Sequence, residues 1–216
     1  MERIITDIQV QKKHPSRRSI FLDGNFFCGV GEDVLVKLQL KKGMEIDDKE
    51  LKKLLYEEEL SKAKNYTYRI LGRRMYTTKE IRDKLQERGY VDDIVVEVIS
   101  TLERYGYLDD KLYAEEWIQS RMRSKPKGKI VIRQELTRKG VDKNIIEESL
   151  NEAFDESWET DMAMELARSK VKSYAKDDLF AAKRKLYSFL LRRGFNYDTV
   201  KQVVDQVLED GNVEEL

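Results

Sequence analysis

The chain has few of the residues that build metal sites and disulfides. Its 216 residues include a single cysteine, Cys28, and a single histidine, His14. One of each excludes an internal disulfide and a zinc site of the usual Cys/His kind. His14 lies in a polar segment beside Pro15, without a partner that would suggest a catalytic dyad. We therefore expect no cofactor, and a lone thiol predicts a reducing, cytoplasmic location.

Proline and long apolar runs are also scarce. Two prolines and 11 glycines, with 38% charged and 40% hydrophobic residues, are typical of a very soluble helical protein. No apolar run approaches the length of a membrane span, and residues 1–3 lack the pattern of a secretion signal. The length allows one or two domains. The composition thus predicts a cytoplasmic protein without a membrane partner.

Motifs for nucleotide binding and metal-dependent hydrolysis are missing or weak. Gly24 and Gly29 have the spacing of a phosphate-binding loop, but Val30 and Gly31 stand where lysine and a hydroxyl residue are needed. Pairs of adjacent aspartates, which could hold two metals in a nuclease, occur at 47–48, 92–93, 109–110 and 177–178. Each pair lies at an expected helix start, where acids stabilise the helix. We prefer capping, and interpret the chain as a binding protein rather than an enzyme.

An internal repeat is the strongest feature that the sequence contains. The phrase aliphatic-x-x-x-aliphatic-x-x-cation-glycine occurs three times, ending at Gly89, Gly140 and Gly194, about 51 and then about 54 residues apart. Its two aliphatic residues, such as Ile132 and Leu136, share one face of a helix. The cation suits the end of the helix dipole, and glycine lets the chain leave the helix in a left-handed conformation.

A further helix is predicted on each side of this phrase. After each glycine, apolar residues at steps of three and four form one stripe, and aspartates stand near the helix start as caps or first-turn acids: Asp92, Asp142 and Asp198. The helix before the phrase holds matching residues in all three repeats, with Trp117 at a packing position. Each repeat is therefore three helices in about 50 residues, and neighbouring repeats should stack into an elongated, curved array.

The first 45 residues differ from the repeats. Residues 4–10 alternate and are β-branched, and Asp23-Gly24 between the apolar runs 19–22 and 26–28 predicts a β-hairpin. We expect two or three short antiparallel strands, with residues 34–40 as a short helix or another strand. This extension either caps the open end of the array or supplies a further docking surface.

The predicted fold is thus mostly α, with three tandem three-helix repeats and a short N-terminal β-hairpin extension. No repeat shows a spare apolar stripe, so we expect a monomer. The predicted boundaries place the extension at 1–45 and the repeats at 46–108, 109–158 and 159–216, the last with an acidic tail.

Charge is balanced overall but separated along the chain. The 41 Lys and Arg equal the 41 acids, yet acids gather at 45–59 and 205–216, whereas cations recur in all three repeats. Such cations form either a solvated face or a phosphate-binding surface, and their recurrence makes binding worth proposing. The candidates for nucleic-acid or filament binding are Arg73, Arg74, Arg82, Arg88, Arg121, Arg123, Lys125, Lys127, Lys129, Arg133, Arg138, Lys139, Lys183, Arg184, Lys185, Arg192 and Arg193.

Two blocks resemble motifs of the RecX family, regulators of the bacterial RecA recombinase. Residues 106–110 resemble the family signature Gly-Tyr-(Leu/Ile)-(Asp/Asn)-(Asp/Glu), and residues 128–141, with Glu135 and Leu136, resemble Gly-x-x-x-Ile-x-x-Glu-Leu-x-x-Lys-Gly-(Ile/Val). Lys129 stands where many members have proline. The resemblance covers residues 60–208 and assigns structural roles to Gly89, Gly106, Tyr107, Leu108, Asp109, Asp110, Gly128, Ile132, Leu136 and Gly140.

The resemblance implies both a fold and a function. It implies three tandem three-helix repeats that bind the RecA–DNA filament and bind single- or double-stranded DNA weakly. It also implies inhibition of RecA ATPase, strand exchange and coprotease activity, and so modulation of recombination, DNA repair and the SOS response. We expect the basic loop 121–129 to face the filament. Two alternatives stay open: a basic helical DNA-binding protein without a RecA partner, and a helical scaffold for another protein.

Overall fold

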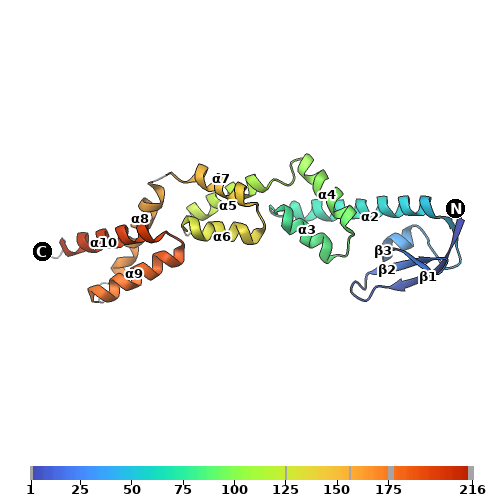
Figure 1. Ribbon diagram of the computed structural model, residues 1–216, viewed down its shortest axis with the longest axis horizontal. Helices are drawn as coiled ribbons and strands as arrows, with labels where there is room; N and C mark the ends of the chain where they lie inside the picture. The colour runs from blue at the N-terminus through green and yellow to red at the C-terminus, as the bar shows by residue number, and fades with distance from the viewer. Residues whose placement is uncertain (1, 125, 156, 175–177, 214–216) are drawn as a thin grey trace. The chain divides into compact units, whose positions relative to one another are not determined.

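The computed structural model describes residues 2–213, apart from 125, 156 and 175–177 (Figure 1). The chain divides into two compact units, Met1–Leu108 and Asp109–Leu216. As predicted, the described residues form three three-helix repeats and a small N-terminal antiparallel sheet. The first unit holds the sheet and the first repeat, and the second unit holds the other two repeats.

The N-terminal sheet has four strands in the order β3-β2-β1-β4: β1 (Glu2–Val10), β2 (Arg17–Leu22), β3 (Asn25–Gly31) and β4 (Glu45–Asp47). Asp23 and Gly24 both have positive φ, 49° and 82°, as the predicted two-residue hairpin requires. Residues 32–37 form the helix α1 (Glu32–Lys37), which decides between the two alternatives for this segment. We expected two or three strands, and the sheet has four. The strand that the prediction missed is β4, which pairs with the start of β1.

The first repeat consists of α2 (Asp48–Leu71), α3 (Thr78–Glu87) and α4 (Asp92–Arg104). Asp47 caps α2 by accepting hydrogen bonds from two backbone amides, and Thr77 with Glu80 forms a capping box at the start of α3. The predicted stripes meet in one core, in which Ile81 and Leu85 are fully buried. A third hydrophobic partner, the apolar side of α4, completes this core.

The second unit repeats this arrangement twice. Its elements are α5 (Asp110–Arg123), α6 (Lys129–Lys139), α7 (Lys143–Ala153), α8 (Trp158–Val171), the 3-10 turn η1 (Lys172–Tyr174), α9 (Leu179–Arg193) and α10 (Tyr197–Val213). Gly140 and Gly194 end α6 and α9 with φ of 81° and 89°, as the repeat phrase predicts. The sequence spacing also predicts an insertion of about five residues near 174–178 in the third repeat; Tyr174 belongs to η1, and 175–177 lie outside the described residues.

The second and third repeats contact each other through the backbone at two glycines, Gly128 and Gly194. The Gly128 amide donates to the Arg193 carbonyl at 2.9 Å, and the Ile130 amide donates to the Gly194 carbonyl at 3.2 Å. A Cβ atom on Gly128 would lie 2.2 Å from the Gly194 carbonyl oxygen. The loop segment with Pro126 and Gly128 is therefore packed against the end of α9.

The buried leucine of the second repeat offers a test of its core. Leu136 is fully buried, so Leu136→Ala should lower the free energy of unfolding by roughly 2–5 kcal/mol. Both tryptophans of the chain pack against this core, so their fluorescence during urea unfolding reports on it. The matched control, Leu112→Ala, changes a residue that is 46% exposed and should cost less than about 0.5 kcal/mol. Equal effects of the two would refute the assignment.

The glycine contact between repeats offers a second test. Gly128 has φ −71° and ψ 164°, which alanine adopts without strain, so Gly128→Ala adds only the clash with Gly194. We expect a loss of about 1–3 kcal/mol in urea unfolding monitored by tryptophan fluorescence. Gly72→Ala is the control, because its added Cβ meets nothing closer than 3.5 Å. A stabilised Gly128→Ala protein would show that the contact does not constrain packing.

Candidate nucleic-acid and filament interface

The RecX-like signature at residues 106–110 is a helix stop followed by a helix start. Gly106 follows α4 with φ 71°, and the next residue, Tyr107, packs edge-on against Tyr68 with ring centroids 5.5 Å apart. Leu108 is buried in the first core, and Asp109 caps α5 by accepting from the Leu112 amide at 2.9 Å. The signature therefore ends one unit and begins the next, and four of its five residues have structural roles.

Several predicted binding cations are held in ion pairs. Arg133 makes two hydrogen bonds to Glu147, at 2.6 and 2.8 Å, and Lys183 contacts Asp205 at 2.7 Å. Arg74 contacts Glu80 at 3.2 Å, and its guanidinium lies 3.6 Å from the centre of the Tyr76 ring. The charge of such a cation is largely balanced before any ligand arrives. Sequence position alone did not show these pairings.

Glu135 gathers the cations of the basic loop. Its carboxylate accepts from Arg121 at 2.7 Å, from Trp117 at 2.9 Å and from Lys127. The Arg121 guanidinium lies 4.2 Å above the Trp117 ring, and Lys139 approaches the same ring. We call these residues, 117, 121, 127, 135 and 139, the Glu135 cluster. It ties the end of α5 and the following loop to α6. Sequence reasoning missed this role, although Glu135 belongs to the second RecX-like block.

The surroundings of the Glu135 carboxyl shift its pKa. Burial raises its pKa, whereas the hydrogen bonds from Lys127, Arg121 and Trp117 lower it, and the net result is a pKa below the ordinary 4.5. The carboxylate is therefore stabilised in its charged form. Its contribution to folding is present above pH 4.5 and is lost as the pH falls through the lowered pKa.

The remaining predicted cations differ in exposure. Arg88 lies 3.9 Å above the Tyr66 ring, and Lys129 lies 5.6 Å from the Phe154 ring. Arg193 donates to the Pro126 carbonyl and so belongs to the contact between repeats. Arg82 is half-buried, and Lys125 lies outside the described residues. The candidates that the structure leaves exposed are Arg73, Arg74, Arg88, Arg123, Arg138, Lys183, Arg184, Lys185 and Arg192.

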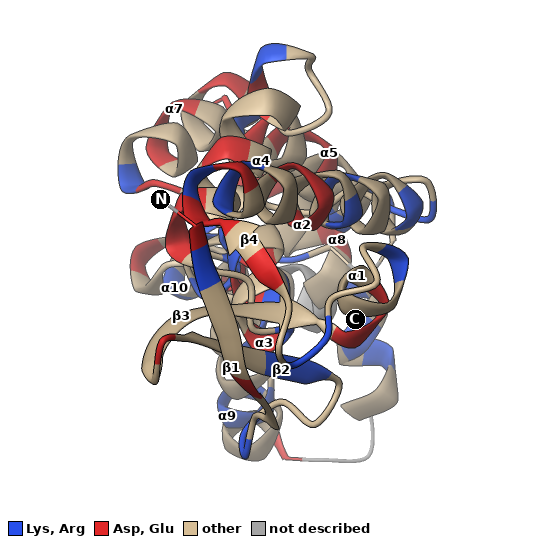
Figure 2. Cartoon of the chain, turned by 90° about the vertical axis from the view of Figure 1, so that its right-hand side faces the viewer, with Lys and Arg blue, Asp and Glu red and all other residues tan. Residues whose placement is uncertain are grey.

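One helix concentrates exposed cations without acids. All residues of α9 are described, and the helix contains five Lys and Arg but no acidic residue. Figure 2 shows this contrast with α7, which carries several acids. The structure brings Arg184, Lys185 and Arg192 together around one hollow. Of the other exposed candidates, Lys183 also lies on α9, whereas the rest lie in the turn after α2, just after α3, and on α5 and α6.

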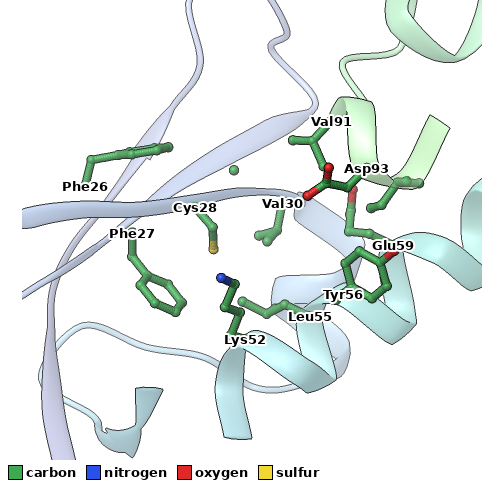
Figure 3. A pocket seen from close by; sticks show the side chains of 12 residues that line it. Phe26, Phe27, Cys28, Val30, Lys52, Leu55, Tyr56, Glu59, Val91 and Asp93 are labelled. Atoms are coloured by element: carbon green, nitrogen blue, oxygen red, sulfur yellow. The ribbon is translucent and has the colours of Figure 1, made fainter. Parts of the chain in front are cut away.

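An apolar cavity in the first unit has no counterpart in the sequence-based predictions. It has a volume of about 270 Å³ and lies between β3, α2 and the start of α4 (Figure 3). Phe27, Val30 and Leu55 line it, with Lys52 and Asp93 among its polar groups. Cys28 also lines this cavity. Burial raises the pKa of the Cys28 thiol to about 12, so the thiol is protonated at neutral pH and Cys28 acts as a packing residue.

Acid side chains in the described part of the chain do not gather into a metal site. No group of three or more His, Cys, Asp or Glu among the described residues is arranged to hold a metal ion. Asp47, Asp109 and Asp142 instead accept backbone hydrogen bonds at helix starts. None of the helices in the described regions combines the length and apolar character needed to cross a membrane.

Comparison with known families accounts for most of the chain. The RecX N-terminal domain matches residues 3–47, and the first, second and third three-helix domains of RecX match 63–102, 109–150 and 158–204. The chain belongs to the RecX family. The resemblance stated from two sequence blocks is thereby confirmed, and it extends to the N-terminal sheet.

Relatives match the chain over nearly its full length. A regulatory protein RecX of Clostridium botulinum (strain Eklund 17B / Type B) is 33% identical over 94% of this chain and 96% of its own. The regulatory protein RecX of Bacillus subtilis (strain 168) is 34% identical, over 94% of this chain and 76% of its own. A crystal structure of a regulatory protein RecX aligns with a TM-score of 0.66 and 26% identity, covering 94% of this chain and 99% of that one. These names describe the relatives as regulatory proteins.

The pKa of Glu135 yields a pH-dependent prediction. Glu135→Gln should lower the free energy of unfolding most above about pH 5, where the carboxylate is charged. The difference from the native chain should shrink as the pH falls below 4.5, because protonation removes the same ion pairs. Urea unfolding followed by tryptophan fluorescence at several pH values measures this. Glu116→Gln, at an exposed position on the neighbouring helix, is the control, and a pH-independent effect of Glu135→Gln would contradict the assignment.

Proposed function

We propose that this protein binds the RecA–DNA filament and inhibits RecA ATPase, strand exchange and coprotease activity. It thereby modulates recombination, DNA repair and the SOS response. The observation that carries this proposal is the match of all four RecX domains, in order, along one chain. In the aspartate pairs 47–48 and 109–110 the first residue caps a helix, which agrees with a regulator rather than a two-metal nuclease.

The distribution of cations supports binding through several weak contacts. Exposed arginines occur on each repeat, for example Arg73, Arg123 and Arg184. Contacts spread over adjacent filament subunits add through effective concentration, so a filament should be preferred to free RecA. Arg121 and Lys127 of the Glu135 cluster both contact the Glu135 carboxylate, and we assign these two cations to positioning the loop. Exposed Arg123 and Arg138 of the second repeat are the better candidates for filament contact.

RecA ATP hydrolysis on single-stranded DNA tests the proposal directly. The full chain, added well below one copy per RecA, should inhibit hydrolysis if it caps filaments or acts over long distances. Inhibition only near saturation would indicate coating of the filament groove. Absence of inhibition, with DNA binding intact, would refute the RecA proposal and favour a DNA-binding protein without a RecA partner.

A double substitution tests the second repeat. Arg123→Ala with Arg138→Ala should raise the concentration needed for half-inhibition several-fold, with about 1 kcal/mol lost across the two exposed charges. Far-UV circular dichroism and the Tm should be unchanged, because both side chains are exposed. Lys53→Ala, a change at an exposed lysine of α2, is the control for net charge. Undiminished inhibition by the double variant would exclude these two arginines from the interface.

A further inference from the structure

A basic hollow lies on the third repeat. It has a volume of about 280 Å³ and is lined by Tyr174, Arg184, Lys185, Ser188 and Arg192. Three cations and two hydroxyl groups surround it, and no acid is among these lining residues. A phosphate group presents several strong acceptor oxygens, which guanidinium, ammonium and hydroxyl donors bind together. The hollow thus has the chemistry of a phosphate site.

The hollow continues into an exposed stripe along α9. Arg184, Ser188 and Arg192 are spaced by four residues and therefore follow one face of the helix. The Arg192 guanidinium donates to the Ser188 hydroxyl, which joins two of these residues directly. One step of four towards the start of α9 reaches Phe180. The whole stripe is about 18 Å long, since a helix rises about 1.5 Å per residue.

Phe180 is the feature that distinguishes this stripe from an ordinary basic surface. Its side chain is 84% exposed, more than any other large hydrophobic residue among those described. It contributes little to the core of the third repeat, whose members are buried on the other side of α9. A second aromatic ring, Tyr174, lies between Lys170 and Lys185, with each ammonium about 5.5 Å from its centre. Rings and cations therefore alternate on this surface.

We propose that the stripe Phe180–Arg184–Ser188–Arg192, with Tyr174 and Lys185, binds single-stranded nucleic acid. A backbone phosphate occupies the hollow, and an unstacked base lies on the Phe180 ring. Every base has a face that can stack on an aromatic ring, so such binding tolerates any sequence. Bases in a duplex are already stacked on one another, so Phe180 favours the single strand. This inference rests on the proposed function for its choice of nucleic acid as partner.

Charge balance favours α9 over the basic loop as the phosphate-binding element. Arg121 and Lys127 both contact the Glu135 carboxylate, and Arg133 is paired with Glu147. Within the described residues, Arg184 and Arg192 contact no carboxylate. A phosphate therefore finds unbalanced charge on α9, whereas in the loop it would have to compete with an existing carboxylate. An acidic protein surface would suit the cations, but it would leave the Phe180 ring without a base to stack on.

Direct DNA binding by the full chain, without RecA, tests this inference. The probe is a fluorescein-labelled oligothymidylate, compared with a duplex of equal length by fluorescence anisotropy. Phe180→Ala should weaken binding of the single strand by roughly five- to hundredfold, the range for loss of one stacked base, and should change duplex binding little. Phe26→Ala, which removes another exposed aromatic residue, on β3, should have no effect.

Two further variants separate stacking from simple apolar contact and identify the phosphate. Phe180→Trp should retain affinity, whereas Phe180→Leu should bind as weakly as Phe180→Ala, because only a ring stacks. Log affinity falls as log salt rises. Arg184→Ala with Arg192→Ala should make this fall less steep, by about 0.7 in slope for each phosphate that these arginines neutralise. Lys201→Ala, at an exposed position of α10, is the charge control.

The outcomes separate this inference from the proposed function. Native affinity for oligothymidylate in both Phe180→Ala and the double arginine variant would overturn the inference, as would full affinity of Phe180→Leu. Variants that lose RecA inhibition but keep DNA binding would assign the stripe to a protein surface and also overturn it. Loss of single-strand binding in these variants supports the inference, even if the native chain fails to inhibit RecA and the proposed function falls.

Discussion

Close approach at two of the repeat glycines, Gly89 and Gly194, is the constraint on which packing between neighbouring modules within each unit depends. Gly194 ends α9 in a left-handed conformation, and the bare Gly128 backbone lies against it. Gly89 follows α3 in the same conformation, and there a Cβ atom would lie 2.9 Å from the Arg17 side chain of the N-terminal sheet. Glycine at these two positions therefore has two roles. It ends a helix, and the absence of a side chain leaves room for the module that precedes it in the chain.

The N-terminal sheet adds a directional contact to this close approach. Arg17 and Glu59 form a buried ion pair at 2.7 Å, and the same two side chains bond to the backbone at Gly29 and Gly31. A buried pair of this kind contributes little net stability compared with apolar packing, but breaking it is costly. The pair therefore fixes how β3 lies on α2. The sheet covers α2 incompletely, since the apolar cavity beside this contact is open, with Phe26 exposed at its edge.

Local patterns were predictable from the sequence, and contacts between distant residues were not. The Leu136 and Leu186 stripes and the left-handed glycines follow from spacing within one helix, and Asp23-Gly24 marks its own turn. Strand β4 was missed because its three residues pair with the beginning of β1, far back in the chain. Arg121 was predicted to bind a ligand because its ion pair could not be seen in the sequence. Its partner, Glu135, lies on another helix. The exposure of Phe180 was not predictable either, because the sequence pattern around an exposed phenylalanine does not differ from that around a buried one.

Ion pairing changes how a charged repeat protein should be interpreted. Counting Lys and Arg along the chain favours the loop between α5 and α6, where cations are densest. The Glu135 carboxylate contacts two of them and holds that loop against its own helices, next to the Gly128 contact with α9. In the proposed function the cluster acts on binding indirectly, because it holds the loop that leads to the Gly128 contact with the third repeat. Weak contacts on both repeats add only when the spacing of the repeats suits the ligand. A substitution at Glu135 or Gly128 should for this reason weaken multivalent binding without removing any group that touches the ligand.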